Sequence, residues 1–435
     1  MRYRNHTDKL LFIGLLLTIL LGGCGKGTDS TADGIMLKVW AHAGQESERT
    51  VLQQQVDRFN QTDSYTKVQL TLIPEGSYNA QIQAAAIAGE LPDLLELDGP
   101  FLSAYAWQGH LRPLANLLDN KLLADLLPSI TAQGSYADRL WAVGIYDSGL
   151  GLYADRSKLL QAELRIPSLQ QPWSLDEFEA ALKQLASQDP DGQVLDLKLN
   201  YAGEWYTYGL SPMLQSAGGD LIERERHDSA DGVLNGPHSI AILSRLQGWI
   251  ADNLVDPNID DAAFTSRRVP LALGGHWNYQ QYHSNLGDDL LLLPLPDFGT
   301  GSKTGLGSWC WSITADSERP EAAASFLEFL LSTEEVLSMA NANSAVPATR
   351  SAIDASPLYR QDGPLHLFVA QLNQGHGVPR PRTPAYPIIT AEFQKIVDRI
   401  RSGGDVQRVL DSAVEVIDRE IEDNQGYPWQ GVAKP

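Results

Sequence analysis

The stretch MLKVWAHAGQESERTVLQQQVDRFN, residues 36–60, combines two patterns of apolar residues that indicate a strand followed by a helix. Residues 36–40 read as a short strand, and residues 46–60 carry large apolar side chains on one helical face, namely Val51, Leu52, Val56 and Phe59. A strand with alternating polar and apolar residues, a helix ending near Gly89 and a strand at residues 94–97 follow. This alternation predicts a doubly wound α/β sheet.

Length and charge exclude several classes of protein. A chain of 435 residues suggests two or three domains, each with a sizeable core. The net charge of −21 argues against nucleic acid as a partner, because binding it calls for a basic face. The nine histidines show no H-x-x-x-H pairing and no cysteine support, so we expect no metal site and no cofactor. No G-x-S-x-G nucleophile motif is present.

The N-terminus reads as a targeting signal. Basic residues precede the apolar run 10–21, which as a helix would span about 18 Å against a hydrocarbon core of about 30 Å. This length fits a signal peptide, residues 1–23, rather than a membrane span. Its ending, Leu21-Gly22-Gly23-Cys24, resembles the bacterial lipoprotein signal, which implies lipidation of Cys24. The alternative is a plain signal peptide with an incidental cysteine.

The segment after the cysteine contains no large apolar side chain, so residues 24–34 are expected to form a tether. The mature protein is therefore expected outside the cytoplasm, lipid-anchored to a bacterial membrane in the periplasm or on the outer cell surface. With Cys24 lipidated, Cys310 has no disulfide partner and is expected to be a small buried side chain.

Several segments together resemble a known family, the extracellular solute-binding proteins of sugar-type ABC transporters, or maltose-binding-like class. The segments are VWAHAGQESE (39–48), AAIAGELPDLLELDG (85–99), YAWQGHLRPL (105–114), GIYDSGLGLYADRSKL (144–159), FTSRRVPLALGGHWNY (264–279), GSWCWSITADSERPEAAASFLEFLLS (307–332) and PRPRTPAYP (379–387). Their order and spacing cover nearly the whole mature chain. The resemblance implies two doubly wound α/β lobes joined by a hinge, as in type II periplasmic binding proteins.

The resemblance also implies how the chain is divided between these lobes. Residues 35–146 with 276–314 would form the N-terminal lobe, and residues 147–275 with 315–435 the C-terminal lobe. A carbohydrate ligand would bind in the cleft between them, and closure would present both lobes to the permease subunits of an ABC importer. The implied protein is a monomer without catalytic residues.

A sugar site needs two kinds of side chain, and both occur where strands are expected to end. The faces of sugar rings pack on aromatic rings, and sugar hydroxyls suit carboxylates and guanidinium groups. Ligands of α/β sheets lie beyond the carboxyl ends of strands. The candidates at such places are Trp40, Glu46, Asp98, Tyr146, Asp147, Glu204, Trp205, Trp277, Tyr279, Trp309 and Arg382.

The resemblance carries ligand contact onto eight of these positions: Glu46, Asp98, Tyr146, Asp147, Trp277, Tyr279, Trp309 and Arg382. Arg380 is an alternative to Arg382, since both lie in the PRPRTP segment. Other aromatic residues are expected in the core because of their helical or strand context, namely Trp107, Trp141, Trp173 and Trp249. His42 and His276 are expected to be structural hydrogen-bonding groups.

Two other readings stay open at this stage. A secreted polysaccharide-active enzyme would also use aromatic residues and paired acids, and 54 acidic residues allow many pairings. The same fold could instead bind a non-sugar solute such as a peptide or a polyamine, which the acidic balance would suit.

Overall fold

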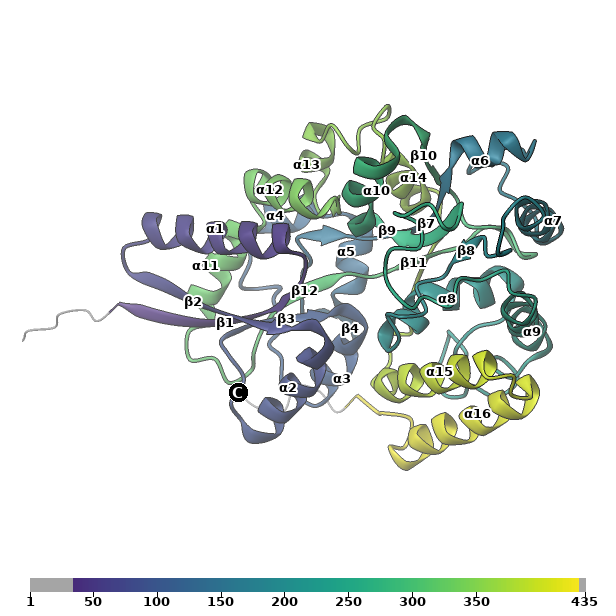
Figure 1. The fold of residues 1–435 in the computed structure, drawn as a ribbon. Coiled ribbons are helices and arrows are strands. Elements are labelled where there is room, and N and C mark those ends of the chain that lie inside the picture. Colours follow the sequence, from purple (N-terminus) through teal and green to yellow (C-terminus); the bar gives the residue numbers. More distant parts are fainter. Residues whose placement is uncertain (1–33, 430–435) are drawn as a thin grey trace, which may run out of the picture.

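The computed structural model describes residues 34–429, which form two α/β lobes lying side by side (Figure 1). The predicted two-lobed α/β fold is confirmed. The predicted signal peptide, Cys24 and nearly all of the tether lie outside the described residues. Within residues 34–429, no helix combines the length and the hydropathy that a membrane crossing needs.

The first lobe is built on a four-stranded sheet with β1 (Ile35–Ala43) near its centre. On one side β1 pairs in parallel with β2 (Thr66–Pro74), and on the other with β3 (Leu94–Asp98). The last strand, β12 (Trp309–Ile313), comes from far along the chain and pairs antiparallel with β3. All three parallel strands therefore end at the same edge, where a ligand of such a sheet is expected.

Helices cover both faces of this sheet (Figure 1). On one face lie α1 (Glu46–Thr62), α11 (Pro320–Leu330) and α12 (Thr333–Asn343), and on the other lie α2 (Glu75–Ala88) and α3 (Leu102–Trp107). The lobe is completed by short elements: η1 (Gly99–Phe101), α4 (Asn120–Asp125), α5 (Pro128–Gln133), β4 (Ser135–Tyr136) and β5 (Arg139–Leu140).

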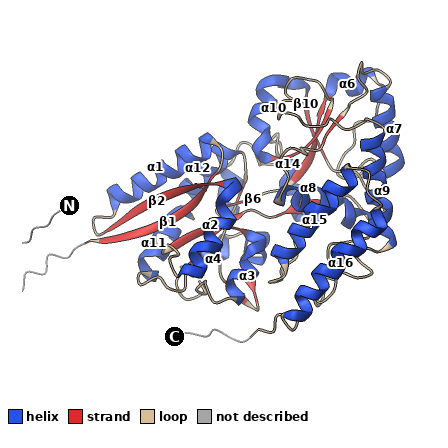
Figure 2. Ribbon diagram, turned by 60° about the horizontal axis from the view of Figure 1, so that its bottom comes forward, coloured by secondary structure: helices blue, strands red, loops and turns tan. Residues whose placement is uncertain are grey.

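The second lobe has its own four-stranded sheet, in the order β10-β7-β9-β8. Its strands are β7 (Leu150–Asp155), β8 (Leu195–Asp196), β9 (Leu271–Gly275) and β10 (Leu290–Leu293). The surrounding helices are α6 (Arg156–Gln161), α7 (Leu175–Ala186), α8 (Glu204–Ala217), α9 (Pro237–Ala251), α15 (Tyr386–Arg401) and α16 (Val406–Asp423). Figure 2 shows these helices enclosing the strands.

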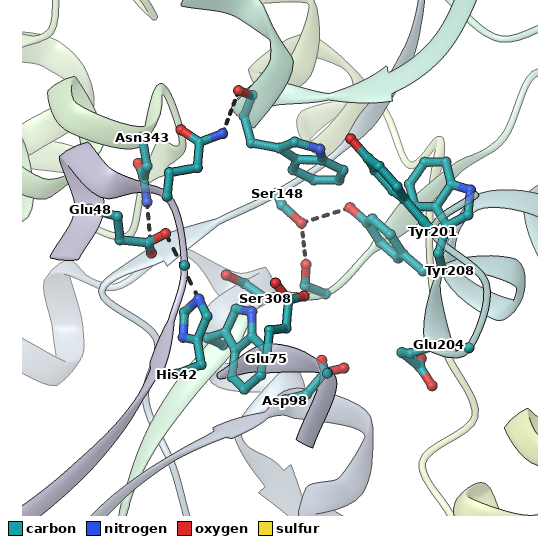
Figure 3. A pocket seen from close by; sticks show the side chains of 18 of the residues that line it. His42, Glu48, Glu75, Asp98, Ser148, Tyr201, Glu204, Tyr208, Ser308 and Asn343 are labelled. Atoms are coloured by element: carbon teal, nitrogen blue, oxygen red, sulfur yellow. Dashed lines mark hydrogen bonds and ion pairs between the residues drawn. The ribbon is translucent and has the colours of Figure 1, made fainter. Parts of the chain in front are cut away.

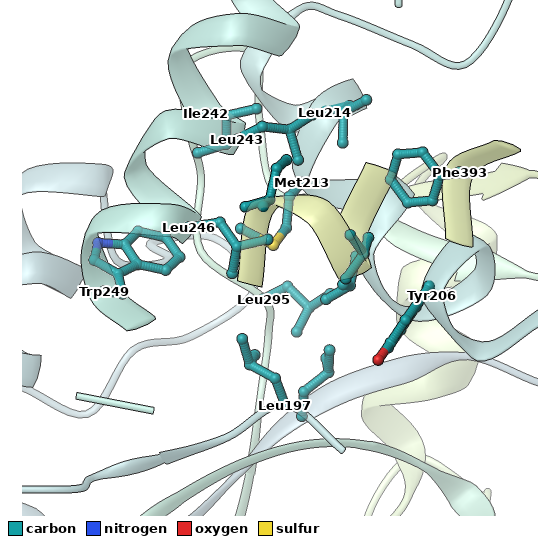
Figure 4. Close-up of a cluster of buried hydrophobic side chains, with 14 of the residues drawn as sticks. Leu197, Tyr206, Met213, Leu214, Ile242, Leu243, Leu246, Trp249, Leu295 and Phe393 are labelled. Carbon is teal, nitrogen blue, oxygen red and sulfur yellow. The ribbon is translucent and has the colours of Figure 1, made fainter. Parts of the chain in front are cut away.

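One hydrophobic cluster holds the second lobe together (Figure 4). It joins α8 and α9 to the C-terminal helices, since Leu214 and Leu246 lie in the same cluster as Phe393. The C-terminal helices therefore pack with α8 and α9 in this lobe.

Short strand pairs lie where the chain passes between the lobes. β6 (Tyr146–Asp147) pairs with β13 (Val346–Pro347), and β11 (Thr304–Leu306) pairs with β14 (Gly377–Pro379). The remaining elements are η2 (His276–Asn278), α10 (Tyr279–Leu286), η3 (Gly287–Asp289), α13 (Arg350–Ala355) and α14 (His366–Asn373). Narrow two-strand connections of this kind leave room for the lobes to rotate relative to each other.

The division of the chain between the lobes differs from the prediction in two segments. β10 pairs with β7 of the second sheet, although residues 276–314 were predicted as part of the first lobe; only β12 of that stretch joins the first sheet. Conversely, α12 packs on α1 in the first lobe, although residues 315–435 were predicted for the second. Short connections explain both: a helix or strand that closely follows a sheet strand stays beside that sheet.

Most of the tryptophans that were predicted in the core are buried. Trp141, Trp173 and Trp249 are at most 5% exposed, whereas Trp107 is only half-buried. Cys310 on β12 is also buried, as predicted. These residues take no part in the wall of the cleft between the lobes.

Candidate ligand-binding cleft

A cavity of about 860 Å³ lies between the two lobes. Its first-lobe wall is formed beyond the carboxyl ends of β1 and β3 and by the start of α2, and its second-lobe wall by η2 and the N-terminus of α8. Cavities of roughly 300–1,000 Å³ are typical of small-molecule sites. Figure 3 shows His42 and Glu48 on one side of the cavity and Tyr201, Tyr208 and Glu204 on the other.

The first-lobe wall presents a stacked pair of rings. The imidazole of His42, at the end of β1, lies parallel to the indole of Trp309 on β12, with ring centroids 3.8 Å apart and an interplanar angle of 4°. Trp309 also meets Tyr78 edge to face at 5.2 Å. Because strands β1, β3 and β12 are adjacent, residues far apart in sequence form one flat surface there.

His42 is held between carboxylates. Its Nδ1 lies 2.7 Å from Glu96 Oε2, and its Nε2 lies 3.8 Å from Glu48 Oε2. Burial alone would lower the pKa of His42, but the attraction of Glu96 and the hydrogen bond to it outweigh burial and raise the pKa to about 9. The imidazole is therefore protonated at neutral pH and is one of the cations of this wall.

Glu48 is the acidic residue of α1 that faces the cleft. Its carboxylate accepts a hydrogen bond from the hydroxyl of Tyr146 at 2.7 Å and one from Asn343 Nδ2 at 3.4 Å. These partners come from β6 and α12, so the carboxylate is held by two other segments of the chain.

The second-lobe wall is a cluster of larger rings. Trp277 in η2 lies 6.1 Å from both Trp205 and Tyr208 of α8, and Tyr201 meets Trp205 at 5.5 Å. Gly275 makes this placement possible, because a Cβ at that position would overlap the indole of Trp277. The cluster offers aromatic faces opposite the His42–Trp309 pair, as a site for sugar rings would.

An ionic bridge lies at the base of the cleft. Arg380, which follows β14, donates to Asp98 Oδ1 at 3.0 Å and to Glu204 Oε1 at 2.5 Å. Asp98 ends β3 in the first lobe and Glu204 begins α8 in the second, so the bridge connects the lobes. The Arg380 guanidinium also lies over the Tyr208 ring at 4.8 Å, and Gly307 lacks the Cβ that would collide with it.

Asp261, near the second-lobe edge of the cavity, is fixed from behind. It accepts hydrogen bonds from Lys198 Nζ at 2.9 Å and from the Tyr201 hydroxyl at 3.1 Å. Lys198 is fully buried and also pairs with Asp196 at 2.7 Å. Lys198 thus pairs with both Asp196 and Asp261, and the Asp261 side chain is the one that lines the cavity.

The structure brings six of the predicted site residues together in the wall of this cavity: Asp98, Tyr146, Glu204, Trp205, Trp277 and Trp309. They come from both lobes. Their meeting depends on β3, β6, α8, η2 and β12 approaching one another, which places the ends of separate elements around one space.

The other five predicted residues do not line the cavity: Trp40, Glu46, Asp147, Tyr279 and Arg382. Trp40 lies too early on β1 and packs against a hydrophobic cluster below the strand end. Glu46 is exposed at the first position of α1. Glu48 lies two residues later, on a different side of the helix, and is therefore the residue that faces inward.

The remaining three point elsewhere for local reasons. Asp147 is fully buried and accepts from Gln133 Nε2 and the Ser148 amide, because consecutive strand residues face opposite sides. Tyr279 begins α10 and packs in a core cluster. Arg382 is exposed and donates to the carbonyl of Ala132, so the predicted alternative, Arg380, is the arginine of the cleft.

Several residues of the wall were missed from sequence, above all His42, Glu48, Glu75 and Tyr208. His42 and His276 were assigned structural roles only, although both line the cavity. His42 could have been found, because it lies at the end of the first predicted strand. Glu75 and Tyr208 carry no such signal, since their orientation depends on how α2 and α8 pack.

Metal ligation finds no support among the described residues. Within residues 34–429, no group of three or more His, Cys, Asp or Glu side chains is placed to hold a metal ion. Four carboxylates of the cleft wall lie beside cations instead: Asp98 and Glu204 beside Arg380, Glu48 beside His42, and Asp261 beside Lys198. The arrangement is suited to holding a polar molecule by hydrogen bonds and ring contacts.

Known proteins are similar to this chain in both sequence and structure. The chain is 25% identical over 360 residues to an uncharacterised lipoprotein in the oleD 5′ region of Streptomyces antibioticus, which covers 79% of this chain and 77% of that protein. In structure it is similar to the GacH receptor of Streptomyces glaucescens, solved unliganded and with acarbose (TM-score 0.77, 18% identity, covering 90% of this chain and 99% of that one).

A second similar structure is an ABC transporter solute-binding protein from Thermotoga lettingae bound with α-D-tagatose. Its TM-score is 0.76 at 21% identity, over 89% of this chain and 99% of that one. The profile of a family described as bacterial extracellular solute-binding protein matches residues 54–365, which is most of the chain. The protein therefore belongs to the bacterial extracellular solute-binding protein family.

Proposed function

We propose that this protein binds a mono- or oligosaccharide in the interlobe cleft and delivers it to the permease of an ABC importer. One observation carries the proposal: the cavity has aromatic surfaces on opposite lobes and fixed carboxylates with a guanidinium at its base. Aromatic faces pack on sugar rings, and the charged groups form strong hydrogen bonds with hydroxyls. The complexes of the structurally similar proteins with acarbose and α-D-tagatose support it.

Binding and closure would be linked by contact with both lobes. A ligand that touches Trp309 of the first lobe and Trp277 of the second stabilises the closed arrangement relative to the open one. A direct contact between the lobes already exists at the rim, where Gln45 Nε2 donates to the carbonyl of Trp277 at 2.7 Å. The closed form would be the one that the permease recognises.

The cellular setting forms part of the same proposal. The Gly22-Gly23-Cys24 ending and the similarity to a Streptomyces lipoprotein support a lipid anchor on Cys24, with the lobes outside the cytoplasm. The protein would act as a monomer and would release its ligand chemically unchanged.

A thermal-shift screen against a carbohydrate panel tests the binding function. A saccharide at 100 times its Kd is expected to stabilise the protein by about 2.7 kcal/mol, which raises the melting temperature by several degrees. Chromatography of the recovered ligand is expected to show it intact. A panel in which no saccharide shifts the transition, or in which the saccharide is cleaved, would contradict the proposal.

Trp277→Ala and Trp309→Ala are each expected to weaken saccharide binding at least tenfold. Each removes one aromatic face of the cavity, and a tenfold change corresponds to about 1.4 kcal/mol. Titration calorimetry measures the affinities, and circular dichroism checks the fold. Trp107→Ala is the matched control, because Trp107 is half-buried and does not line the cavity. Equal affinities in all three variants would refute the role of the two rings.

A further inference from the structure

The cleft carries more negative than positive charge. Its wall contains five carboxylates, which are Glu48, Glu75, Asp98, Glu204 and Asp261. Among the described residues that line it, the cationic groups are Arg380 and His42, since burial lowers the pKa of His276 to about 4 and leaves it neutral. A neutral sugar would leave this excess of negative charge uncompensated.

Four of the five carboxylates have a partner that accounts for them. Asp98 and Glu204 share Arg380, Glu48 accepts from Tyr146 and lies near His42, and Asp261 accepts from Lys198. These four carboxylates therefore already have hydrogen-bonding or charged partners within the protein.

Glu75 is different. It lies in the cavity wall at the start of α2 and is open to solvent there, and in the described part of the chain its carboxylate accepts no hydrogen bond and forms no ion pair (Figure 3). Burial raises the pKa of Glu75, and repulsion from Asp98, Glu48 and Glu96 adds to the rise, although His42 acts in the opposite direction. The surroundings of this carboxylate therefore favour the arrival of a positive charge.

A second observation points to a ligand that also has hydroxyl groups. Ser308 is 7% exposed and lines the same cavity, and its Oγ has no hydrogen-bond partner. Asn278, at 4% exposure, likewise has an unpartnered Oδ1 and lines the wall on the opposite lobe. Buried polar atoms are normally hydrogen-bonded, so both atoms are suited to a ligand that donates or accepts hydrogen bonds.

From these observations we infer that the ligand is an amino-saccharide, a sugar bearing a protonated amine that pairs with Glu75. The inference rests on the proposed saccharide-binding function and narrows its substrate class. The hydroxyls of the sugar would meet Ser308 and Asn278, its rings would pack on the tryptophans, and its ammonium group would supply the cation that Glu75 lacks. An ammonium–carboxylate pair in a partly desolvated cleft is stronger than the same pair in water.

Calorimetry with matched sugars tests the inference. The probes are D-glucosamine, D-galactosamine and their di- and trisaccharides, each beside its N-acetyl form and its parent neutral sugar, at low ionic strength and pH 6.5. At least one amine is expected to bind tenfold or more tightly than both of its matched sugars. Raising NaCl to 0.5 M is expected to reduce this preference, because salt screens the ion pair.

Glu75→Gln provides the matched variant, since it keeps the shape of the side chain and removes its charge. It is expected to weaken amine binding at least tenfold and to abolish the preference for the amine over its matched neutral sugar. Glu46→Gln is the control, because Glu46, like Glu75, is an exposed first residue of a first-lobe helix but lies outside the cavity wall. Glu46→Gln is expected to bind every sugar as the wild type does.

The possible outcomes distinguish a failure of the amino-saccharide inference from a failure of the proposed saccharide-binding function. Neutral sugars that bind as tightly as amines, or an amine preference that persists in Glu75→Gln, would overturn the inference and leave saccharide binding intact. Binding of spermidine more tightly than any amino-saccharide would also overturn it, because the site would then recognise charge without a sugar. Failure of every saccharide to bind would remove both the inference and the proposed function.

Discussion

Arg380→Ala is expected to destabilise the protein by about 3–5 kcal/mol, the usual cost of leaving a buried ion pair without one partner. The side chains of Arg380 and Asp98 are 6% and 11% exposed, so both charges are largely shielded from water. Glu204 would lose the same partner. Urea unfolding followed by circular dichroism at pH 7 measures the effect.

The pH dependence of that loss has a definite sign. Burial raises the pKa of Glu204 and Arg380 opposes the rise, so removing Arg380 raises the pKa further. A carboxyl whose folded pKa lies above its unfolded value destabilises the folded state when ionised, and the penalty disappears as pH falls below the unfolded pKa of about 4.3. The destabilisation is therefore expected to be largest at neutral pH and to shrink below pH 5.

Arg382→Ala is the matched control for this experiment. Arg382 is two residues away and exposed, and within residues 34–429 it donates to the carbonyl of Ala132, so its loss is expected to change stability by no more than about 0.5 kcal/mol. Equal losses in the two variants, or a loss in Arg380→Ala that does not depend on pH, would show that the bridge between Asp98 and Glu204 does not hold the base of the cleft.

His42 is expected to make the stability of the wild type depend on pH in the alkaline range. Its pKa of about 9 in the folded state exceeds the ordinary value of 6.5, because Glu96 outweighs the effect of burial. The resulting stabilisation is fully present below pH 6.5 and is lost as pH rises through 9. A difference of this size in pKa corresponds to about 3 kcal/mol.

Denaturant unfolding of the wild type and of His42→Gln at several pH values between 6 and 10 measures this contribution. The stability difference between the two proteins is expected to be largest near pH 6 and to decline toward pH 10. His283→Gln serves as the control, since His283 is exposed and stacks on Tyr279. A difference that stays constant with pH would show that His42 is neutral in the folded protein.

The order of elements in the first lobe could be predicted because it is local. The alternation of apolar residues in β1 and β2 and the helical spacing of α1 follow from neighbouring residues alone. The pairing of β10 with β7 could not be predicted in this way, since the run Leu290–Leu293 indicates a strand but not which sheet the strand joins. The two-lobed architecture came from the resemblance to a family.

Part of the site could be predicted from the positions of the expected strand ends. Asp98 and Trp309 lie at or beside strand ends that share one edge of the sheet, so a strand-end argument finds them. Glu46 and Glu48 could not be distinguished, because which residue faces inward depends on where α1 begins and how it is rotated. Arg380 contacts Asp98, whereas Arg382 contacts Ala132. Both partners lie more than 200 residues away in sequence, so local sequence could not distinguish the two arginines.

A crystal structure of the protein with the tightest saccharide from the panel tests the central claim most directly. The account expects the sugar in the cavity between the lobes, in contact with Trp309 on one side and Trp277 on the other, with hydroxyls near Asp98 and Glu204. A saccharide bound outside this cavity, or held by only one lobe, would contradict the account.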